Sequence, residues 1–245
     1  MEESGFVSEV FVSIQGEGLY VGLLQLFVRT AGCSLRCSYC DTPESQGRTK
    51  KCVMIETGRS LDNPVDTRVL ADTVEQIIHR THTIHSISLT GGEPLEQPDF
   101  LESFLELTRR FGKPHYLETN GLHPEALERI LYLVDIVSLD IKLPSLCGGG
   151  DLFSVYERTL TLLRGRELFC KIVIGEGFDP GEFEQASEML SDFDPDLPLV
   201  IQPATPRGDS EPMDGNTLID LYGQASARLR NVRIIPQCHR IMNVR

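Results

Sequence analysis

Short apolar runs alternate along this chain with segments of helical period, and this alternation constrains the fold more than any other feature. It favours parallel βα units over an antiparallel sandwich. The sequence therefore predicts an α/β fold, an incomplete (β/α)6-type barrel with mostly parallel strands. The expected strands are 24–29, 84–90, 115–118, 136–141, 168–174, 199–202 and 232–235, and the expected helices are 67–79, 98–110, 124–131, 152–163, 181–190 and 217–229.

Polar residues or glycines lie at or near the end of each predicted strand. Barrel enzymes gather their active sites at the carboxyl ends of the strands. One such residue alone could be a solvated turn or a helix cap, but their gathering at one rim is hard to explain by capping. The residues are Arg29 and the cysteines after it, Thr90–Glu93, Glu118–Asn120, Asp140–Lys142, Lys171, Gln202–Pro203 and Gln237–His239.

Three cysteines, Cys33, Cys37 and Cys40, stand within eight residues directly after the first predicted strand. Three thiolates can hold one face of an iron–sulfur cube, which leaves one iron open to an external chelator. A structural zinc site instead closes tetrahedrally with four protein ligands, usually in paired C-x2-C hooks. The spacing therefore favours a [4Fe–4S] cluster over structural zinc or buried core cysteines.

The cysteine loop resembles the cluster loop of radical S-adenosylmethionine (SAM) enzymes, in which the amino and carboxylate groups of SAM chelate the open iron. Gly91 and Gly92 remove side chains where the backbone must approach a ligand, so residues 90–94 are a candidate clamp for the methionyl end of SAM. Glu93 could accept a hydrogen bond from the ammonium group of SAM. The alternative is a Gly-Gly turn capped by Glu93.

A second set of polar residues suits a nitrogen-rich small molecule that bears an acid group. Glu17 and Glu118 can accept from the N–H edge of a heterocycle, and Arg29 can bind a carboxylate bidentately. His239 belongs to the same set. The alternatives are a rim salt bridge for Arg29 and a surface histidine for His239.

Thr42 follows Asp41 beside the cysteine loop and offers a hydroxyl to a magnesium ion that bridges to substrate oxygens. Magnesium commonly takes few protein ligands. The alternative is a helix N-cap, because Asp-Thr is a frequent pair there.

The amino-acid composition argues against nucleic acid and membranes as binding partners. The chain has 245 residues, 40% of them hydrophobic, which is enough to bury a core. Its net charge of −13 argues against broad nucleic-acid binding, which needs a basic face. The sequence has no basic leader and no long apolar run, so we expect a cytoplasmic protein that does not bind membranes.

Four cysteines remain after the cluster set. Cys170 lies in an apolar run and is expected in the core, whereas Cys52 and Cys147 are expected to be loop thiols, and Cys238 has no ligand spacing to the others.

The motifs together resemble those of the 7-carboxy-7-deazaguanine synthase family, radical SAM enzymes of the 7-deazapurine pathway to queuosine and archaeosine. The resemblance runs essentially end to end. It rests on the Gln-Gly-Glu-Gly opening at 15–18, the cysteine loop, Thr-Gly-Gly-Glu-Pro-Leu at 90–95, Glu-Thr-Asn-Gly at 118–121, and the ending Gln-Cys-His-Arg-Ile-Met-Asn at 237–243.

The resemblance implies a reaction and a set of site residues. The reaction is conversion of 6-carboxy-5,6,7,8-tetrahydropterin to 7-carboxy-7-deazaguanine with loss of ammonia. It implies one [4Fe–4S] cluster, SAM and Mg2+ as cofactors, an electron donor such as flavodoxin or ferredoxin, and a homodimer. The implied SAM-binding residues are Tyr39, Thr90, Gly91, Gly92, Glu93, Asp140, Lys142 and Gln202; the pterin-binding residues are Gln15, Glu17, Arg29, Glu118 and His239; Thr42 is implied for magnesium.

We expect residues 1–245 to form a single radical SAM domain with an insertion at about 43–66. That stretch has no clear period, apart from a possible short strand at 52–56, so it is expected to act as a lid or an insertion. The glycine-rich run 147–151 is expected to be a flexible gate or a plain linker.

Two other functions fit parts of the pattern. A glycyl-radical-enzyme activase shares the cysteine spacing but needs a protein substrate and no pterin pocket. A non-enzymatic metal-binding or redox-sensing module would close a zinc site with the three cysteines and His239.

Overall fold

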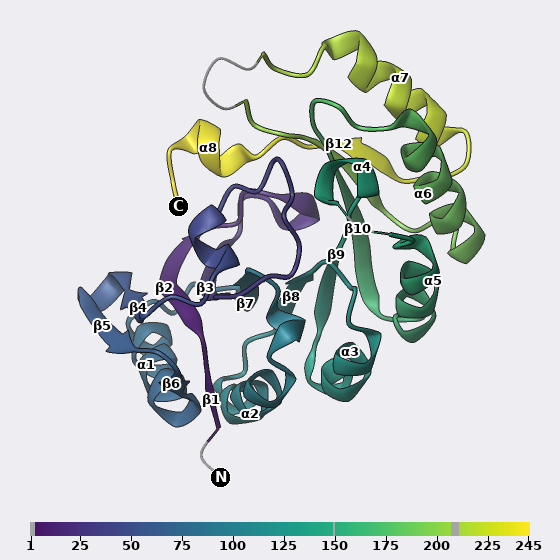
Figure 1. The fold of residues 1–245 in the computed structure, drawn as a ribbon. Coiled ribbons are helices and arrows are strands. Elements are labelled where there is room, and N and C mark those ends of the chain that lie inside the picture. Colours follow the sequence, from purple (N-terminus) through teal and green to yellow (C-terminus); the bar gives the residue numbers. More distant parts are fainter. Residues whose placement is uncertain (1–2, 149, 207–210) are drawn as a thin grey trace.

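A single ten-stranded sheet organises the computed structural model, which describes residues 3–148, 150–206 and 211–245. Its strand order is β12-β11-β10-β9-β8-β7-β3-β2-β4-β5 (Figure 1). The seven strands from β12 to β3 run parallel, whereas β2 is antiparallel to β3. The sheet is curved and open, as predicted for an incomplete barrel.

The strands of the large sheet are β2 (Val7–Ile14), β3 (Leu24–Thr30), β4 (Lys51–Met54), β5 (Arg59–Asp62), β7 (Ser86–Gly91), β8 (His115–Thr119), β9 (Ile136–Ile141), β10 (Glu167–Ile174), β11 (Leu199–Pro203) and β12 (Val232–Ile234). A two-stranded sheet pairs β1 (Ser4–Gly5) with β6 (Val65–Asp66). The α-helices are α1 (Thr67–Arg80), α2 (Pro98–Thr108), α3 (Pro124–Ile130), α4 (Pro144–Cys147), α5 (Phe153–Leu162), α6 (Pro180–Phe193), α7 (Gly215–Ser226) and α8 (Cys238–Met242). Short 3-10 helices are η1 (Gly18–Tyr20), η2 (Pro43–Gln46), η3 (Ile55–Thr57), η4 (Pro94–Glu96), η5 (Arg109–Phe111) and η6 (Leu131–Leu133).

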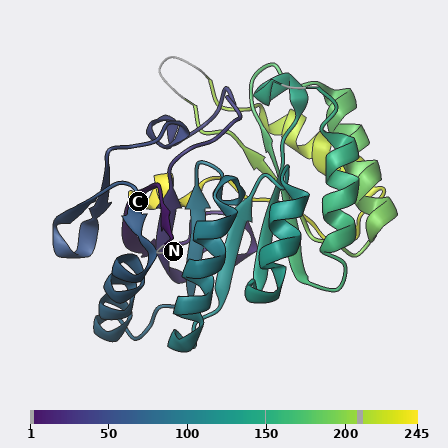
Figure 2. The same ribbon diagram turned by 60° about the horizontal axis from the view of Figure 1, so that its bottom comes forward.

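Helices cover the outer face of the curved sheet (Figures 1 and 2). Each crossover helix packs against its neighbour, α1 on α2, α2 on α3, α3 on α5, α5 on α6 and α6 on α7. All the strands and helices expected from the alternation are present, with ends shifted by up to three residues. The predicted order of strands and helices is confirmed because each helix buries one apolar face against the sheet, and this face is visible as a period in the sequence.

Helix α1 illustrates how the local sequence sets these elements. Asp66 caps its N-terminus by accepting hydrogen bonds from the backbone N–H of Arg68 and Val69, at 2.9 and 3.0 Å. Leu70 and Val74, one helical turn apart, are both fully buried against the sheet.

Strand β2 is not among the predicted strands, the first of which begins at Leu24. It forms an antiparallel pair with β3, and the turn between the two strands enters the sheet interior at η1. There Tyr20 packs edge-on against Tyr116, with ring centroids 5.3 Å apart. A Cβ on Gly18 would lie 2.5 Å from the ring of Phe169, and its φ of +65° also favours glycine. This aromatic cluster fills the interior below the polar rim.

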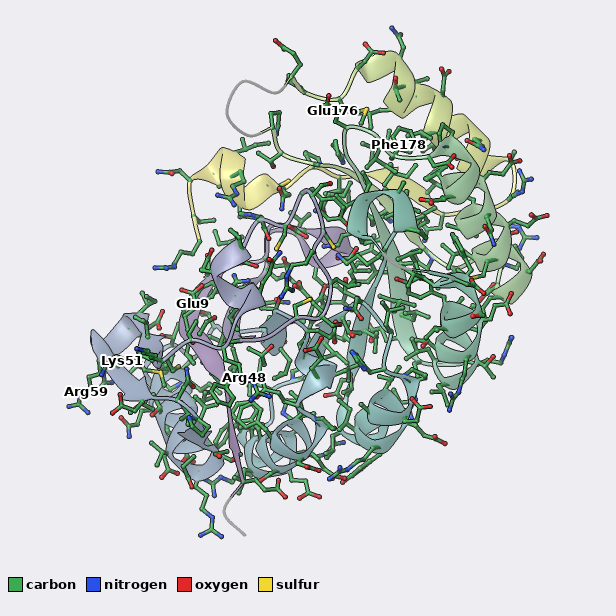
Figure 3. The ribbon with its side chains drawn as sticks, in the orientation of Figure 1. Glu9, Arg48, Lys51, Arg59, Glu176 and Phe178 are labelled. Carbon is green, nitrogen blue, oxygen red and sulfur yellow. The ribbon has the colours of Figure 1, made fainter. Side chains whose placement is uncertain are left out.

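Residues 43–66 are more structured than expected. Instead of a lid without secondary structure, they supply η2, β4, η3, β5 and β6. The expected strand at 52–56 is β4, which begins at Lys51 and ends at Met54. Lys51 and Arg59 mark this β4–β5 hairpin at the outer edge of the sheet, while Glu176 and Phe178 lie in the loop after β10 (Figure 3).

Two cysteines expected in loops are buried instead. Cys52 is 0% exposed because it points inward from β4, where the unpredicted strand β2 pairs with it. Cys147 is 3% exposed at the end of α4. Cys170 lies fully buried in β10, as predicted. Residue 149 of the expected glycine-rich gate lies outside the described residues.

The last segment of the chain returns to its beginning. The backbone N–H of Cys238 donates to the Gly16 carbonyl at 2.8 Å, and the Ser13 hydroxyl donates to the Arg245 carbonyl at 2.9 Å. Helix α8 therefore lies beside the end of β2 (Figure 1). Within the part of the chain that the structure describes, no helix is long and apolar enough to cross a membrane.

Candidate active site at the carboxyl ends of the strands

One pocket at the carboxyl ends of the strands collects the residues that the sequence singled out. Every predicted cluster, SAM, magnesium and pterin residue lines it. They come from the cysteine loop and from the ends of β2, β3, β7, β8, β9 and β11, together with the segment around α8. The lining includes Gln15, Glu17, Arg29, Cys33, Cys37, Tyr39, Cys40, Thr42, Thr90, Gly91, Gly92, Glu93, Glu118, Asp140, Lys142, Gln202 and His239.

The cysteine loop is fixed by backbone hydrogen bonds rather than by packing. The N–H of Gly32 donates to the Ser45 carbonyl at 2.8 Å, and that of Cys33 donates to the Gln46 carbonyl at 3.1 Å. Burial raises the pKa of the Cys33 thiol to about 11. This thiol therefore carries its proton until a metal displaces it, as metal binding to cysteine requires.

Gly91 and Gly92 both line the pocket, and contacts within the protein also require glycine at these positions. A Cβ on Gly91 would lie 2.5 Å from the Thr30 backbone, and one on Gly92 would lie 1.9 Å from the Gly32 carbonyl oxygen. The close approach is therefore between two loops of the protein. It holds the Gly-Gly turn directly against the start of the cysteine loop.

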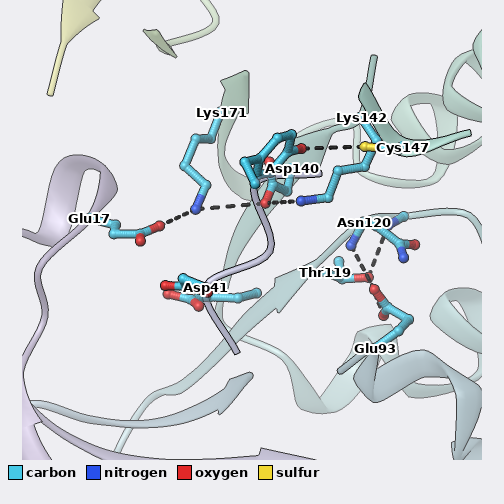
Figure 4. Close-up of polar contacts among 12 residues, drawn as sticks. Glu17, Asp41, Glu93, Thr119, Asn120, Asp140, Lys142, Cys147 and Lys171 are labelled. Atoms are coloured by element: carbon cyan, nitrogen blue, oxygen red, sulfur yellow. Dashed lines mark hydrogen bonds and ion pairs between the residues drawn. The ribbon is translucent and has the colours of Figure 1, made fainter. Parts of the chain in front are cut away.

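Glu93 is 1% exposed, and both of its carboxylate oxygens have protein partners. Oε1 accepts from the Leu95 N–H at 3.0 Å and from the Thr119 hydroxyl at 2.6 Å, and Oε2 accepts from the Asn120 N–H at 2.7 Å (Figure 4). Burial raises the pKa of Glu93 to about 7, although these hydrogen bonds oppose the rise. These bonds join the ends of β7 and β8.

A chain of alternating charges crosses the pocket (Figure 4). Lys142 Nζ lies 2.6 Å from Asp140 Oδ2, Lys171 Nζ lies 3.7 Å from the same oxygen, and Lys171 also pairs with Glu17. Burial alone would lower the pKa values of both lysines, but Asp140 raises them above the ordinary value. Both amines are therefore charged, and Lys171 holds Glu17 as an anion.

Glu17 stands where the two ends of the chain meet. Burial would raise its pKa, but Lys171, Gln237 and His239 together lower it to about 2. The Gln237 amide donates to Glu17 Oε1 at 2.8 Å and to Asp41 Oδ2 at 3.0 Å. Glu17 is therefore an ionised acceptor at neutral pH.

Glu118 is oriented by two neighbours. Gln15 Nε2 donates to its Oε1 at 2.8 Å, and the Thr90 hydroxyl donates to its Oε2 at 2.7 Å. A carboxylate has room for further donors on each oxygen, so Glu118 still has acceptor capacity in the pocket.

Arg29 is held by Glu9, with Nε 2.9 Å from Oε1, and its guanidinium lies 5.3 Å from the centroid of the Phe11 ring. Phe11 in turn stacks on Phe27 at 5.0 Å. The Nε bond leaves the terminal nitrogens of Arg29 as the donors that a carboxylate could use.

Among the residues that the structure describes, two buried acceptors of the pocket have no hydrogen-bond partner in the protein. They are Asp140 Oδ1 and Gln202 Oε1. Unpaired buried acceptors are costly, so their presence at the same wall indicates a ligand with donor groups. SAM offers such donors in its ammonium and hydroxyl groups, and the donor set therefore fits it.

The grouping of possible metal ligands argues against a zinc site. Four ligands at about 2.3 Å from one zinc ion lie roughly 4 Å apart. Among the described residues, the set with ligand atoms within 4.8 Å of one another is Glu17, Asp41 and His239, without any cysteine. The three thiols are thus too widely spread to share one ion with His239, whereas an iron–sulfur cube requires a wider spread.

Sequence reasoning missed several pocket residues. Phe11 and Phe27 line the pocket from the β2–β3 pair. Glu9 supports the lining residue Arg29, and recognising β2 as a strand would have placed Glu9 opposite it. Asp41 was noted only as the neighbour of Thr42. Lys171 was noted at a strand end but was given no site role, although it is 6% exposed and pairs with Glu17.

Comparison with known proteins shows which protein family this chain belongs to. Residues 27–190 match the Radical SAM superfamily. A 7-carboxy-7-deazaguanine synthase of Geobacter sulfurreducens is 41% identical over 242 residues, which cover 96% of each chain. One of Methanothermobacter thermautotrophicus is 39% identical, over 98% of this chain and 97% of its own.

A solved structure agrees on the fold. The crystal structure of QueE from Escherichia coli superposes with a TM-score of 0.63 at 21% identity, covering 96% of this chain and 95% of its own. A radical SAM methyltransferase from Sphaerobacter thermophilus gives 0.61 at 14% identity, over 94% of this chain and 77% of its own. The chain is a radical SAM protein and belongs to the 7-carboxy-7-deazaguanine synthase family.

Proposed function

We propose that this protein converts 6-carboxy-5,6,7,8-tetrahydropterin to 7-carboxy-7-deazaguanine with loss of ammonia, a step of 7-deazapurine biosynthesis. The observation that carries the proposal is that one pocket holds both the three-cysteine loop and the Gln15, Glu17, Arg29, Glu118 and His239 set. A reaction between a SAM-derived radical and a pterin needs both groups at one place. The sequence identity to synthases over the whole chain supports the same reaction.

Cys33, Cys37 and Cys40 would hold the [4Fe–4S] cluster, and the wall with Tyr39, Asp140, Lys142 and Gln202 would hold SAM. When bound, the cluster and SAM would supply radical chemistry that begins with removal of a hydrogen atom from the substrate. Asp140 Oδ1 and Gln202 Oε1 would accept from SAM donors. Thr90, Gly91, Gly92 and Glu93 would shape this wall, Glu93 through its bonds to β8.

Glu17, Glu118, Arg29 and His239 would bind and orient the pterin. Glu17 is an ionised acceptor suited to ring N–H groups, because Lys171 and Gln237 hold its pKa at about 2. Glu118 would accept from a further N–H, in the orientation set by Gln15 and Thr90. Arg29 would bind the substrate carboxylate with its terminal nitrogens, and His239 would close the pocket from the α8 side.

Magnesium is assigned to Thr42 in this proposal. Thr42 lines the pocket directly after Asp41, and an ion with few protein ligands could use the threonine hydroxyl together with substrate oxygens and water. The Glu17, Asp41 and His239 group is the competing position for a cation. Within that group, the carboxylates of Glu17 and Asp41 already accept hydrogen bonds from Gln237. We therefore favour Thr42 as the magnesium ligand.

The remaining parts of the proposal concern partners and organisation. We propose that residues 1–245 act as a single radical SAM domain, that the protein is a homodimer, and that flavodoxin or ferredoxin supplies the electron. We also propose a cytoplasmic setting, which suits a cluster held by cysteine thiolates, because oxidising compartments pair cysteines into disulfides.

The test is an anaerobic assay of the reconstituted enzyme with reductant, SAM, Mg2+ and 6-carboxytetrahydropterin, with products followed by mass spectrometry. We expect 7-carboxy-7-deazaguanine and ammonia in equal amounts, with little net loss of SAM. Formation of 5'-deoxyadenosine without that product would reject the substrate assignment. A glycyl-radical partner would then be the next substrate to test.

A further inference from the structure

Lys171 has no contact with a ligand in the function proposed above, yet it is a buried cation in the wall of the pocket. It lies in β10, is 6% exposed and lines the pocket together with Glu17 and Asp140. Lys171 and Asp140 are register partners on neighbouring parallel strands, and Glu17 faces them from the segment after β2 (Figure 4). Lysine is seldom buried without a partner, so its neighbours indicate what it does.

The position of Lys171 along β10 places it directly above the apolar interior. Phe169, two residues earlier on the same strand, packs with Tyr20 and Tyr116 in the aromatic cluster. Side chains two residues apart point to the same face of a strand, so Lys171 follows Phe169 on this face towards the carboxyl end. Lys171 therefore lies where the apolar interior meets the polar rim.

In the described part of the chain, two of the three donors of the Lys171 amine have no acceptor. Its Nζ donates to Glu17 Oε2, whereas Asp140 Oδ2 at 3.7 Å is beyond hydrogen-bond distance. Asp140 is also neutralised by Lys142, whose Nζ lies 2.6 Å from the same oxygen. Buried donors without acceptors are costly, which indicates that a ligand supplies an acceptor at this point.

Glu17 and Lys171 together present an acceptor beside a donor, because they form an ion pair and both line the pocket. The 2-amino-4-oxo ring of a pterin has the complementary edge: the N–H at position 3 donates and the adjacent carbonyl at position 4 accepts. A 4-amino pteridine reverses this edge, since its position 3 accepts and its position 4 donates.

We propose that Lys171 is a specificity-determining residue that donates a hydrogen bond to the 4-oxo group of the pterin, beside Glu17, which accepts from the adjacent ring N–H. A site built to donate at this point rejects an amino group there, because two donors would face each other. The pocket therefore selects 2-amino-4-oxo pteridines over 4-amino pteridines. The inference rests on the proposed function, since it takes a pterin as the substrate.

The test compares the affinities of two stable ligands, 6-carboxypterin and 2,4-diaminopteridine-6-carboxylate, which differ at this edge. Isothermal titration uses the reconstituted enzyme with SAM and Mg2+ but without reductant, so that neither ligand is turned over. We expect the wild-type protein to prefer 6-carboxypterin by at least about a hundredfold. Lys171→Met removes the donor, and the preference should fall by about tenfold or more.

Lys113→Met is the matched control. Lys113 also donates to protein acceptors, the carbonyls of His82 and Ile84, but it precedes β8 and so lies at the opposite end of the strands. This variant should keep the wild-type preference. If Lys171→Met fails to fold, Lys171→Gln takes its place, because its amide keeps a donor for Glu17 and can also accept; its preference should fall as well.

The proposal is overturned if the wild-type protein binds both ligands equally. It is also overturned if the folded variant of Lys171 loses affinity for both ligands by the same factor, because a purely structural lysine would act in this way. A wild-type protein that binds neither ligand would reject the proposed function as well. Binding of 6-carboxypterin with an unchanged preference in the variant would reject the role of Lys171 alone.

Discussion

Arg29 and Glu9 face each other as register partners across the antiparallel β2–β3 pair, with Nε 2.9 Å from Oε1. Arg245 contacts the other oxygen of Glu9 at 2.8 Å. Glu9 therefore holds the arginine that we propose for the substrate carboxylate. A bidentate contact depends on the plane of the guanidinium, so its partner also affects binding.

We expect Glu9→Gln to weaken substrate binding several-fold while SAM binding stays unchanged, because Arg29 loses its charged partner but keeps its own charge. Isothermal titration or KM measurements for each ligand would check this. Glu75→Gln is the matched control, since it removes a carboxylate from the exposed pair with Arg110 on the outer helices. Equal losses for SAM and substrate would reject a specific effect on Arg29.

Gly92→Ala should destabilise the protein by roughly 1–3 kcal/mol, since the new methyl group would press on the Gly32 carbonyl. The start of the cysteine loop would have to move, so iron content after reconstitution should fall as well. Gly47→Ala is the control, because a Cβ there meets nothing within 4 Å. Thermal melts and iron analysis give the answer, and a Gly92→Ala protein as stable and iron-rich as Gly47→Ala would disprove the contact.

Glu93 should make stability depend on pH. Its pKa in the folded protein is about 7, above the ordinary 4.5, so its contribution is fully present below about pH 4.5 and is lost as the pH rises through 7. The loss should be on the order of 3 kcal/mol. Urea unfolding of the anaerobic apoprotein at pH 5 and 8 should show this loss beyond that of Glu93→Gln. Parallel pH curves for the two proteins would refute a raised pKa.

Thr42→Val should abolish most of the stimulation of activity by Mg2+ while leaving the visible spectrum of the cluster intact, because only the hydroxyl is lost. Asp41→Asn distinguishes the two candidate positions, since it belongs to the Glu17 and His239 group. Magnesium titrations of both variants are the measurement. Normal stimulation in Thr42→Val together with its loss in Asp41→Asn would move the ion to that group.

The sequence predicted the parallel part of the sheet because each βα unit carries its own apolar period, as α1 does with Leu70 and Val74. It did not predict β1, β2, β5 or β6. β5 pairs with its neighbour β4 in a segment without a clear period, whereas β1 pairs with β6, and β2 with β4, across long stretches of the chain that no local pattern reports. The error for Cys52 has the same origin, because β4 is buried only once β2 lies beside it.

The residues of the pocket were predictable where they follow a strand end, as Thr90 and Glu118 do. Their partners were harder to find, because a hydrogen bond such as that from Gln15 to Glu118 spans 103 positions. The role of Glu93 shows a further limit: residue type alone does not tell whether a carboxylate faces a ligand or the backbone of the next strand.

The contact of Gln237 with Glu17 spans 220 positions. Contacts of such separation carry a large loop-closure entropy and are expected to form late in folding. The cysteine loop makes its nearest contacts with Ser45 and Gln46, within fifteen residues of itself, although its bonds to Glu93 and Leu146 also close over long stretches of the chain. The local half of the metal site is therefore expected to form before the pterin wall, which is complete only when the last segment of the chain has returned to the first.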